Sequence, residues 1–255
     1  DVPGTAVISK VMRLLQAISD APSGTTVAEL CRATGYPRPT VHRLLGVLAQ
    51  EGMVGSEGLR GRVLLGPRLV SLAYRAWHGS DLRRRALPHL AALRDETDET
   101  VHLAVPSAGE MVYIDKLESR RAVRMASRIG TRVSLHSSSV GKAFLASLPE
   151  TESEALIANL AMPAFTPHTL TDQAALKAEI AATRRRGYAT DLQENELDIC
   201  CYGGAIRGVA GSPIGCISIS MPRYRFESQD PTRFAEALHR CTGNIAAAML
   251  SPASD

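Results

Sequence analysis

Three polar side chains alternate along one predicted strand in the C-terminal part of the chain. Cys216, Ser218 and Ser220 share one face of this strand, because successive side chains of a strand point to opposite sides. Two hydroxyl groups on one face of an otherwise apolar strand either orient a bound ligand or complete a buried hydrogen-bond network. The residues alone leave both interpretations open.

A second group that could bind a ligand is the start of a predicted helix at Ser139. The hydroxyl of Ser139 can cap this helix, which leaves the backbone N–H groups of Val140, Gly141 and Lys142 directed outward. Such a helix N-terminus suits a carboxylate or another anion. Asp191 would repel an anion directly, so we expect it to accept hydrogen bonds from a ligand hydroxyl or from backbone amides.

The five cysteines include no CxxC pair, which argues against a structural zinc site and against a secreted disulfide framework. Cys200 and Cys201 are adjacent, so on a regular strand they point to opposite faces. A redox switch through this pair is an alternative function. It needs an exposed thiolate with a low pKa, and no basic residue adjoins the pair in the sequence. A reducing cytoplasm is the expected location.

Catalytic motifs are missing from the sequence. His102, His136 and His168 could be combined with a serine and an aspartate into a triad, but no GxSxG nucleophile elbow accompanies them. The chain also has no phosphate-binding loop, HExxH motif or dinucleotide fingerprint. We therefore expect no enzymatic activity, no metal site and no cofactor.

The strongest structural pattern is TVAELCRATGYPRPTVHRLLGVLAQE, at residues 26–51. Thr26 and Glu29 have the spacing of a capping box, which starts a helix, and Gly35 is the type of residue that ends one. A second helix begins near Arg38, and its apolar residues have the spacing of one buried stripe: Val41, Leu44, Leu45 and Leu48. A short helix, a tight turn and a helix with basic residues at its start predict a helix-turn-helix.

In this motif the start of the second helix reaches base edges, and a hairpin wing after it lies against the DNA backbone. A wing that only covers the core of a protein-binding domain is the alternative. Residues 1–80 carry a net charge of +4 and residues 81–255 one of −1, so the positive excess accompanies the motif. The expected DNA contacts are Thr26, Arg38, Pro39, Thr40, His42, Arg43, Arg60 and Arg62.

The whole pattern predicts a DNA-binding domain at residues 1–66, a linker helix at 67–80 and a second domain at 81–255. An amphipathic helix at 5–20 covers the first core with the stripe Val7, Val11, Leu14, Leu15 and Ile18. The linker helix has a narrow apolar seam that either packs on its own chain or forms a dimer: Leu69, Leu72, Ala73 and Ala76. The second domain, with one strand expected around 122–129, has the element order of an α+β fold with a mostly antiparallel sheet covered by helices. No stretch is apolar enough to span a membrane.

Several sequence blocks together resemble the IclR family of bacterial transcriptional regulators: TVHRLLGVLAQEGMV, LGPRLVSLA, SVGKAFLASLP and ENELDICCYGGAI, in that order. The resemblance implies a winged helix-turn-helix, a linker helix and a GAF-like domain that binds a small metabolite, in chains that form homodimers or homotetramers. It selects Asp191, Cys201, Ser218 and Ser220 as pocket residues. We therefore expect a regulator that binds pseudo-palindromic, double-stranded operator DNA and responds to a small carboxylic acid, aromatic acids included.

Overall fold

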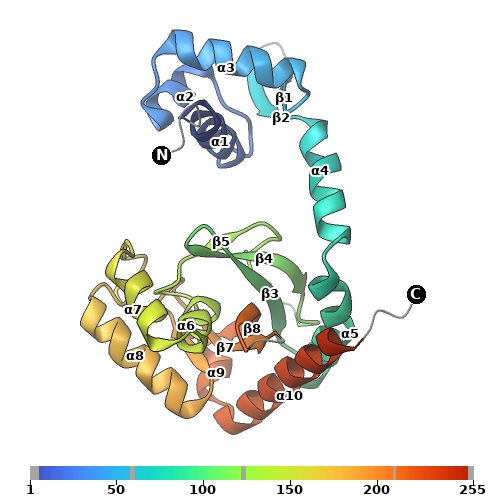
Figure 1. The fold of residues 1–255 in the computed structure, drawn as a ribbon, viewed down its shortest axis with the longest axis vertical. Coiled ribbons are helices and arrows are strands. Elements are labelled where there is room, and N and C mark those ends of the chain that lie inside the picture. Colours follow the sequence, from blue (N-terminus) through green and yellow to red (C-terminus); the bar gives the residue numbers. More distant parts are fainter. Residues whose placement is uncertain (1–5, 58–60, 122–124, 209–210, 252–255) are drawn as a thin grey trace. The chain divides into compact units, whose positions relative to one another are not determined.

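The structure is a computed structural model that describes residues 6–57, 61–121, 125–208 and 211–251 (Figure 1). The chain divides into two compact units, Asp1–Gly79 and Ser80–Asp255. Within the described ranges, no helix is both long enough and apolar enough to cross a membrane.

The first unit contains four helices and one hairpin: α1 (Ala6–Ser19), α2 (Val27–Thr34), α3 (Arg38–Gln50), β1 (Val54–Glu57), β2 (Arg62–Leu65) and α4 (Pro67–His78). The predicted capping box starts α2, because the Glu29 N–H donates to Thr26 Oγ at 3.3 Å and the Thr26 N–H donates to Glu29 Oε2 at 2.8 Å. Gly35 ends α2 in the left-handed conformation, at φ 71°. The four predicted apolar residues of α3 are buried against α1 and Leu30, which confirms the helix-turn-helix.

The predicted stripe of α1 is wrong in part, and the seam of α4 is left on the surface of the single chain. Val7 does not cover the core: its side chain is exposed, as are those of Ile8 and Met12, and the buried residues of α1 begin at Leu14. Helix α4 buries no residue, and of its predicted seam only Leu69 packs partly against the core. Both helices therefore keep large apolar side chains on their surfaces.

The second unit is built on one antiparallel sheet of six strands in the order β5-β4-β3-β8-β7-β6. The strands are β3 (Thr100–Ser107), β4 (Glu110–Leu117), β5 (Arg132–Val133), β6 (Ala189–Leu192), β7 (Ile199–Arg207) and β8 (Pro213–Pro222). The helices are α5 (Asp81–Thr97), α6 (Ser139–Ser147), α7 (Glu150–Ala158), α8 (Gln173–Arg186), α9 (Arg223–Glu227) and α10 (Pro231–Leu250). This element set is the α+β fold that the sequence predicts.

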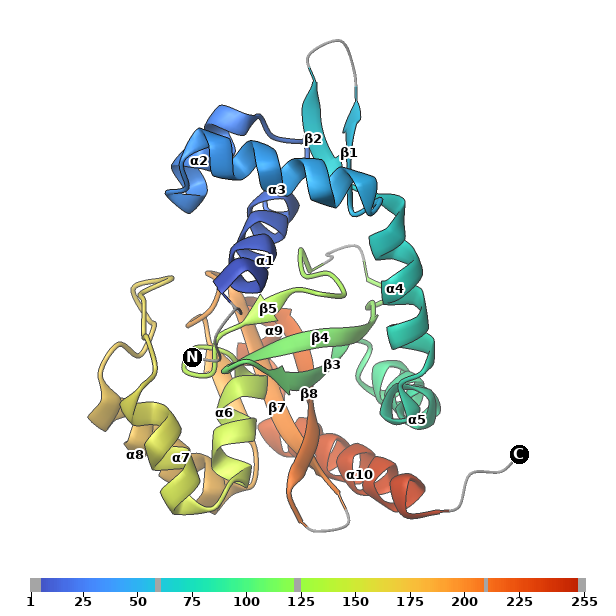
Figure 2. The same cartoon turned by 45° about the horizontal axis from the view of Figure 1, so that its top comes forward.

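Helices cover both faces of the sheet (Figure 2). Helices α5 and α10 pack on one face, in a core built around Leu103, Tyr202 and Ile219. Helices α6, α7 and α8 pack with the other face, in a second core that includes Ala104, Met111 and Cys216. Because β8 lies between β3 and β7, the predicted polar face of β8 is placed at the middle of the second face.

The strand expected around residues 122–129 is not formed by its described part, residues 125–129. Lys116 Nζ donates hydrogen bonds to the backbone carbonyls of Met125 at 2.8 Å and Ser127 at 2.7 Å. These two carbonyls therefore accept hydrogen bonds from a side chain instead of from the backbone of a neighbouring strand. The edge strand β5 forms only at Arg132–Val133.

Candidate functional site

The candidate DNA-reading surface is the exposed face of α3. Arg38, Pro39, His42 and Arg43 are exposed there, and Thr40 is half-buried beside them. Arg38 Nε lies 3.4 Å from His42 Nε2, so these two side chains form one polar group at the start of the helix. The buried stripe on the opposite side of α3 fixes which residues point outward.

Of the two arginines predicted to contact DNA from the wing, the structure describes Arg62. Arg62 donates from Nε to Ser23 O at 3.0 Å and from Nη2 to Gly24 O at 2.6 Å, and it lies 3.5 Å from Glu29. Arg62 therefore ties the wing to the turn before α2, and only part of its side chain stays accessible. Arg60 lies outside the described residues. The hydroxyl oxygen of Thr26, another predicted contact, accepts the Glu29 N–H in the capping box.

A cavity of about 270 Å³ lies at the N-terminus of α6, and we call it the α6 cavity. Four of the predicted ligand-binding residues line it together: Ser139, Asp191, Cys201 and Ser220. Three others, Val140, Gly141 and Ser218, do not line it. The sequence did not single out several further lining residues, among them Tyr113, Ser127 and Asn195.

Helix α6 begins at Ser139 as predicted, but its capping residue lies one position earlier than expected. Ser138, not Ser139, is the N-cap: its hydroxyl accepts from the Gly141 N–H at 3.1 Å, and its carbonyl accepts from the Lys142 N–H at 3.0 Å. The helix thus leaves the N–H groups of Ser139 and Val140 without an intrahelical acceptor. Gly141 has a packing role instead, because a Cβ there would lie 2.5 Å from the Cα of Leu135.

Ser218 does not reach the cavity itself, but its hydroxyl contacts His102, which lines the cavity. His102 Nδ1 lies 3.1 Å from Ser218 Oγ and its Nε2 lies 2.7 Å from Ser127 Oγ. The His102 ring stacks on Tyr113 at a centroid distance of 4.4 Å. Burial, with a smaller effect of Lys116, lowers the pKa of His102 to about 3, so the imidazole is neutral. The only sequence signal for His102 was a polar residue within a strand.

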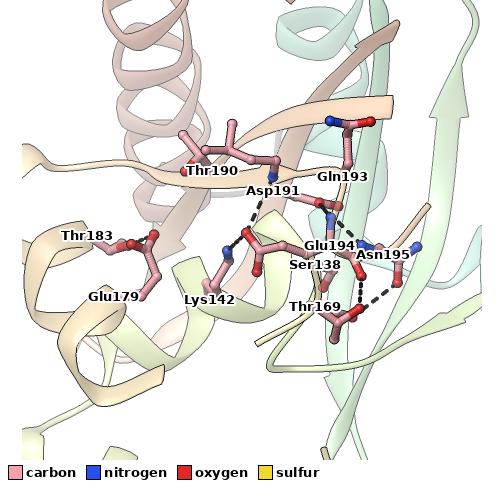
Figure 3. Close-up of polar contacts among 12 residues, drawn as sticks. Ser138, Lys142, Thr169, Glu179, Thr183, Thr190, Asp191, Gln193, Glu194 and Asn195 are labelled. Carbon is pink, nitrogen blue, oxygen red and sulfur yellow. Dashed lines mark hydrogen bonds and ion pairs between the residues drawn. The ribbon is translucent and has the colours of Figure 1, made fainter. Parts of the chain in front are cut away.

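Asp191 is held by the loop that follows β6 (Figure 3). Its Oδ1 accepts from the N–H groups of Glu194 at 2.7 Å and Asn195 at 3.3 Å, as the prediction of backbone amide donors requires. Burial raises the pKa of Asp191 to about 7, with opposite effects from Lys142, which lowers it, and Glu194, which raises it. Thr169 fixes the same loop by donating from Oγ to Glu194 O at 2.6 Å.

The cysteine pair has the environment of inert thiols. Cys201 Sγ donates to Ser220 Oγ at 3.2 Å, and burial raises the pKa of the Cys201 thiol well above its usual value. Burial, followed by the charge of Asp191, raises the pKa of Cys200 to about 11. Neither thiol meets the requirement of an exposed, low-pKa thiolate for redox sensing. Among the described residues, no group of three or more His, Cys, Asp or Glu side chains could hold a metal ion.

Comparison with protein families decides the identity. The model of the IclR helix-turn-helix domain matches residues 7–58, and that of the bacterial transcriptional regulator IclR C-terminal domain matches residues 74–247. The chain belongs to the IclR family. Its helix-turn-helix is thus the DNA-binding domain of an IclR-family transcriptional regulator, and its C-terminal part is the effector domain.

Relatives in the IclR family cover almost the whole chain. The HTH-type transcriptional regulator XynR of Escherichia coli K12 is 29% identical, over 96% of this chain and 98% of its own. The transcriptional repressor IclR of the same organism is 32% identical, over 89% and 84%. The structure of an IclR homolog from Microbacterium hydrocarbonoxydans, complexed with 4-hydroxybenzoate, superposes with a TM-score of 0.77 at 27% identity, over 96% and 99%. The two relatives from Escherichia coli are transcriptional regulators.

Proposed function

We propose that this IclR-family regulator binds operator DNA as a dimer or tetramer and that a small organic acid in the α6 cavity modulates its DNA affinity. The observation that carries this proposal is the convergence of Ser139, Asp191, Cys201 and Ser220 on one cavity at a helix N-terminus. The N–H group of Ser139, which has no intrahelical acceptor, suits a carboxylate, and the hydroxyls can orient it.

The size of the cavity supports a small ligand. At about 270 Å³, the α6 cavity lies near the lower limit of about 300 Å³ for typical ligand pockets. A related protein of similar fold binds 4-hydroxybenzoate, an aromatic acid with one ring. Tyr113, Val133 and Ile199 give this cavity apolar walls that suit a ring or a short aliphatic chain.

Exposed apolar side chains of the first unit support self-association. Val70, Leu72 and Tyr74 of α4 are more than half exposed, and so are Val7, Ile8 and Met12 of α1. Large apolar residues gathered on exposed helices mark interaction surfaces. A second copy is the partner that we propose, because two helix-turn-helix domains are needed to read the two half-sites of a pseudo-palindrome.

The proposed effector acts by differential affinity. A ligand shifts DNA binding only as far as it binds one arrangement of the two DNA-binding domains more tightly than the other. Helix α4 is the covalent link between the helix-turn-helix and the effector domain. We propose that ligand binding changes the spacing of the two DNA-binding domains of the dimer through this helix.

A thermal-shift screen of the full chain against carboxylic acids, 4-hydroxybenzoate and benzoate among them, tests this function. A ligand that binds only the folded state stabilises it by about 2.7 kcal/mol at a concentration of 100 times Kd. Acids that raise the Tm should change operator affinity, and Ser220→Ala should weaken both effects. Ser107→Ala, an exposed serine on the same sheet, is the control. If no acid raises the Tm, the effector proposal is wrong.

A further inference from the structure

The α6 cavity has a buried cluster of two carboxyl groups and one amino group beside it (Figure 3). Lys142 is fully buried, and Asp191 and Glu194 are 4% and 7% exposed. Lys142 Nζ forms an ion pair with Glu194 Oε1, while Glu194 Oε2 is buried without a hydrogen-bond partner in the described part of the chain. With both carboxyl groups ionised, this cluster carries one uncompensated negative charge, which is costly to bury.

The titratable groups around Asp191 do not compensate this charge. They are Lys142 on α6, Glu194 and Glu196 in the loop after β6, Cys200 and Cys201 on β7, Tyr113 on β4, His102 on β3 and, next to Glu194, Glu179 on α8 with its partner Arg186. Among the residues that the structure describes, Lys142 alone places a cation in direct contact with the carboxyl groups of the cluster, and it already forms an ion pair with Glu194. Tyr113, Cys200 and Cys201 have raised pKa values through burial, so they contribute no further negative charge.

The cavity itself supplies no cation for an incoming anion. No lysine or arginine is among its described lining residues. His102 is neutral, and both of its ring nitrogens are within hydrogen-bond distance of serine hydroxyls. Lys116, whose charge acts on His102, directs Nζ at Glu118 and at the carbonyls of Met125 and Ser127. A carboxylate in the cavity would therefore place a second negative charge beside Asp191.

We infer that a carboxylate effector enters the α6 cavity together with one proton from solvent, and that Asp191 holds this proton. The inference rests on the proposed function and adds the protonation state of the bound complex. One anion and one proton enter together, so the net charge of the buried site does not change. The protonated Asp191 becomes a hydrogen-bond donor while Oδ1 keeps its two backbone donors, Glu194 and Asn195.

The expected pH dependence follows from the free site. Burial raises the pKa of Asp191 to about 7, so the ligand-free carboxyl group is protonated below this pH and ionised above it. Binding that requires the proton is then fully available below about pH 6 and is lost as the pH rises through 7. Between pH 6.0 and pH 8.5 the affinity should fall about 30-fold, as the protonated fraction of a group with a pKa of about 7 does.

The test is calorimetry on the full chain with benzoate and 4-hydroxybenzoate as probes, from pH 6.0 to pH 8.5, in buffers of different ionisation enthalpy. Benzoate has no group that titrates in this range. The parent should take up about half a proton per ligand at pH 7, when half of the Asp191 groups are still ionised, and nearly one at pH 8.5. Asp191→Asn should bind without proton uptake and with flat pH dependence. Asp198→Asn, which changes an exposed carboxylate on the loop that follows β6, should keep the parent slope.

A second variant tests the cluster if Asp191→Asn does not fold. In Glu194→Gln the charge of Lys142 acts on Asp191 alone, so the affinity should begin to fall at a lower pH than in the parent. Binding without proton uptake in the parent overturns this inference and leaves the proposed function standing. Proton uptake that persists in Asp191→Asn, or an unchanged pH midpoint in Glu194→Gln, also overturns it. If neither acid binds the parent at any pH, the carboxylate-effector function fails and this inference with it.

Discussion

Gly203 on β7 sets the distance between the sheet and the start of α6. A Cβ at this position would lie 2.4 Å from the carbonyl oxygen of Ser139 and 2.5 Å from its carbonyl carbon. Both atoms belong to the backbone and cannot rotate away. The absence of a side chain at Gly203 therefore allows the N-terminus of α6, which lines the α6 cavity through Ser139, to lie close to the sheet.

The first prediction compares two glycines of the same unit. Gly203→Ala should lower the free energy of unfolding by about 1–3 kcal/mol, because the backbone of α6 must shift to accept the methyl group. Gly243→Ala is the control: this glycine lies in α10 with nothing within 4 Å, so alanine should stabilise the helix by about 0.8–1 kcal/mol. Urea unfolding of both variants measures the difference. Equal stability of the two would contradict the close approach.

The second prediction concerns the thiols. Cys31 is half-buried, whereas Cys200, Cys201, Cys216 and Cys241 are buried with pKa values raised by burial. In the folded protein at pH 8, a thiol reagent should modify Cys31 first, and the other four should react only after denaturation. Mass spectrometry of the labelled peptides measures this order. Rapid modification of Cys200 or Cys201 in the native state would instead support a redox switch through these two thiols.

For single residues, the sequence predicted the face of a strand on which a side chain lies better than it predicted which side chains are in contact. The alternation along β8 correctly placed Ser218 and Ser220 on one face, because strand geometry is local. It could not show that Ser218 reaches the cavity through His102, since the two residues are 116 positions apart. The cap was missed by one residue because three consecutive serines, residues 137–139, lie at the start of α6, and each has the chemistry of an N-cap.

At the scale of elements, α3 carries the third prediction. Arg43 is exposed near the start of this helix, so Arg43→Ala should weaken operator binding by about 1–3 kcal/mol if the guanidinium reads a guanine, with a smaller effect on random DNA. Lys177→Ala in α8 removes the same charge from the effector domain and should change neither. Fluorescence anisotropy with operator and random duplexes gives the comparison. Equal losses on both duplexes would make Arg43 a phosphate contact instead.

Elements whose ends have local signals were the ones predicted well. The capping box and Gly35 bracket α2, so both of its ends could be read from the sequence. Residues 125–129 do not form the expected strand, and the sequence of this segment could not show that Lys116 donates to the carbonyls of Met125 and Ser127. Helix α4 was predicted correctly as an element, but a pattern of apolar residues cannot say whether its seam faces the same chain or another copy.

At the scale of the whole molecule, the fourth prediction concerns self-association. Leu72 is 51% exposed on α4, and burying such a side chain contributes about 1.5–3 kcal/mol. Leu72→Lys should therefore shift the protein toward monomers at micromolar concentration and weaken binding to a two-half-site operator. Ser71→Lys adds the same charge at the neighbouring exposed position and should do so much less. Sedimentation velocity of both variants distinguishes them. Unchanged association of Leu72→Lys would place the interface elsewhere.

The position of β8 between β3 and β7 also determines when the two units can fold during synthesis. Thr100–Ala104 of β3 pair with Cys216–Ser220 of β8, so the middle of the sheet joins segments more than a hundred residues apart. Closing so long a loop costs entropy, and it must wait until β8 has left the ribosome. The first unit has no such requirement, since its core is complete by residue 69. A nascent chain can thus present a folded DNA-binding domain well before it has a cavity for an effector.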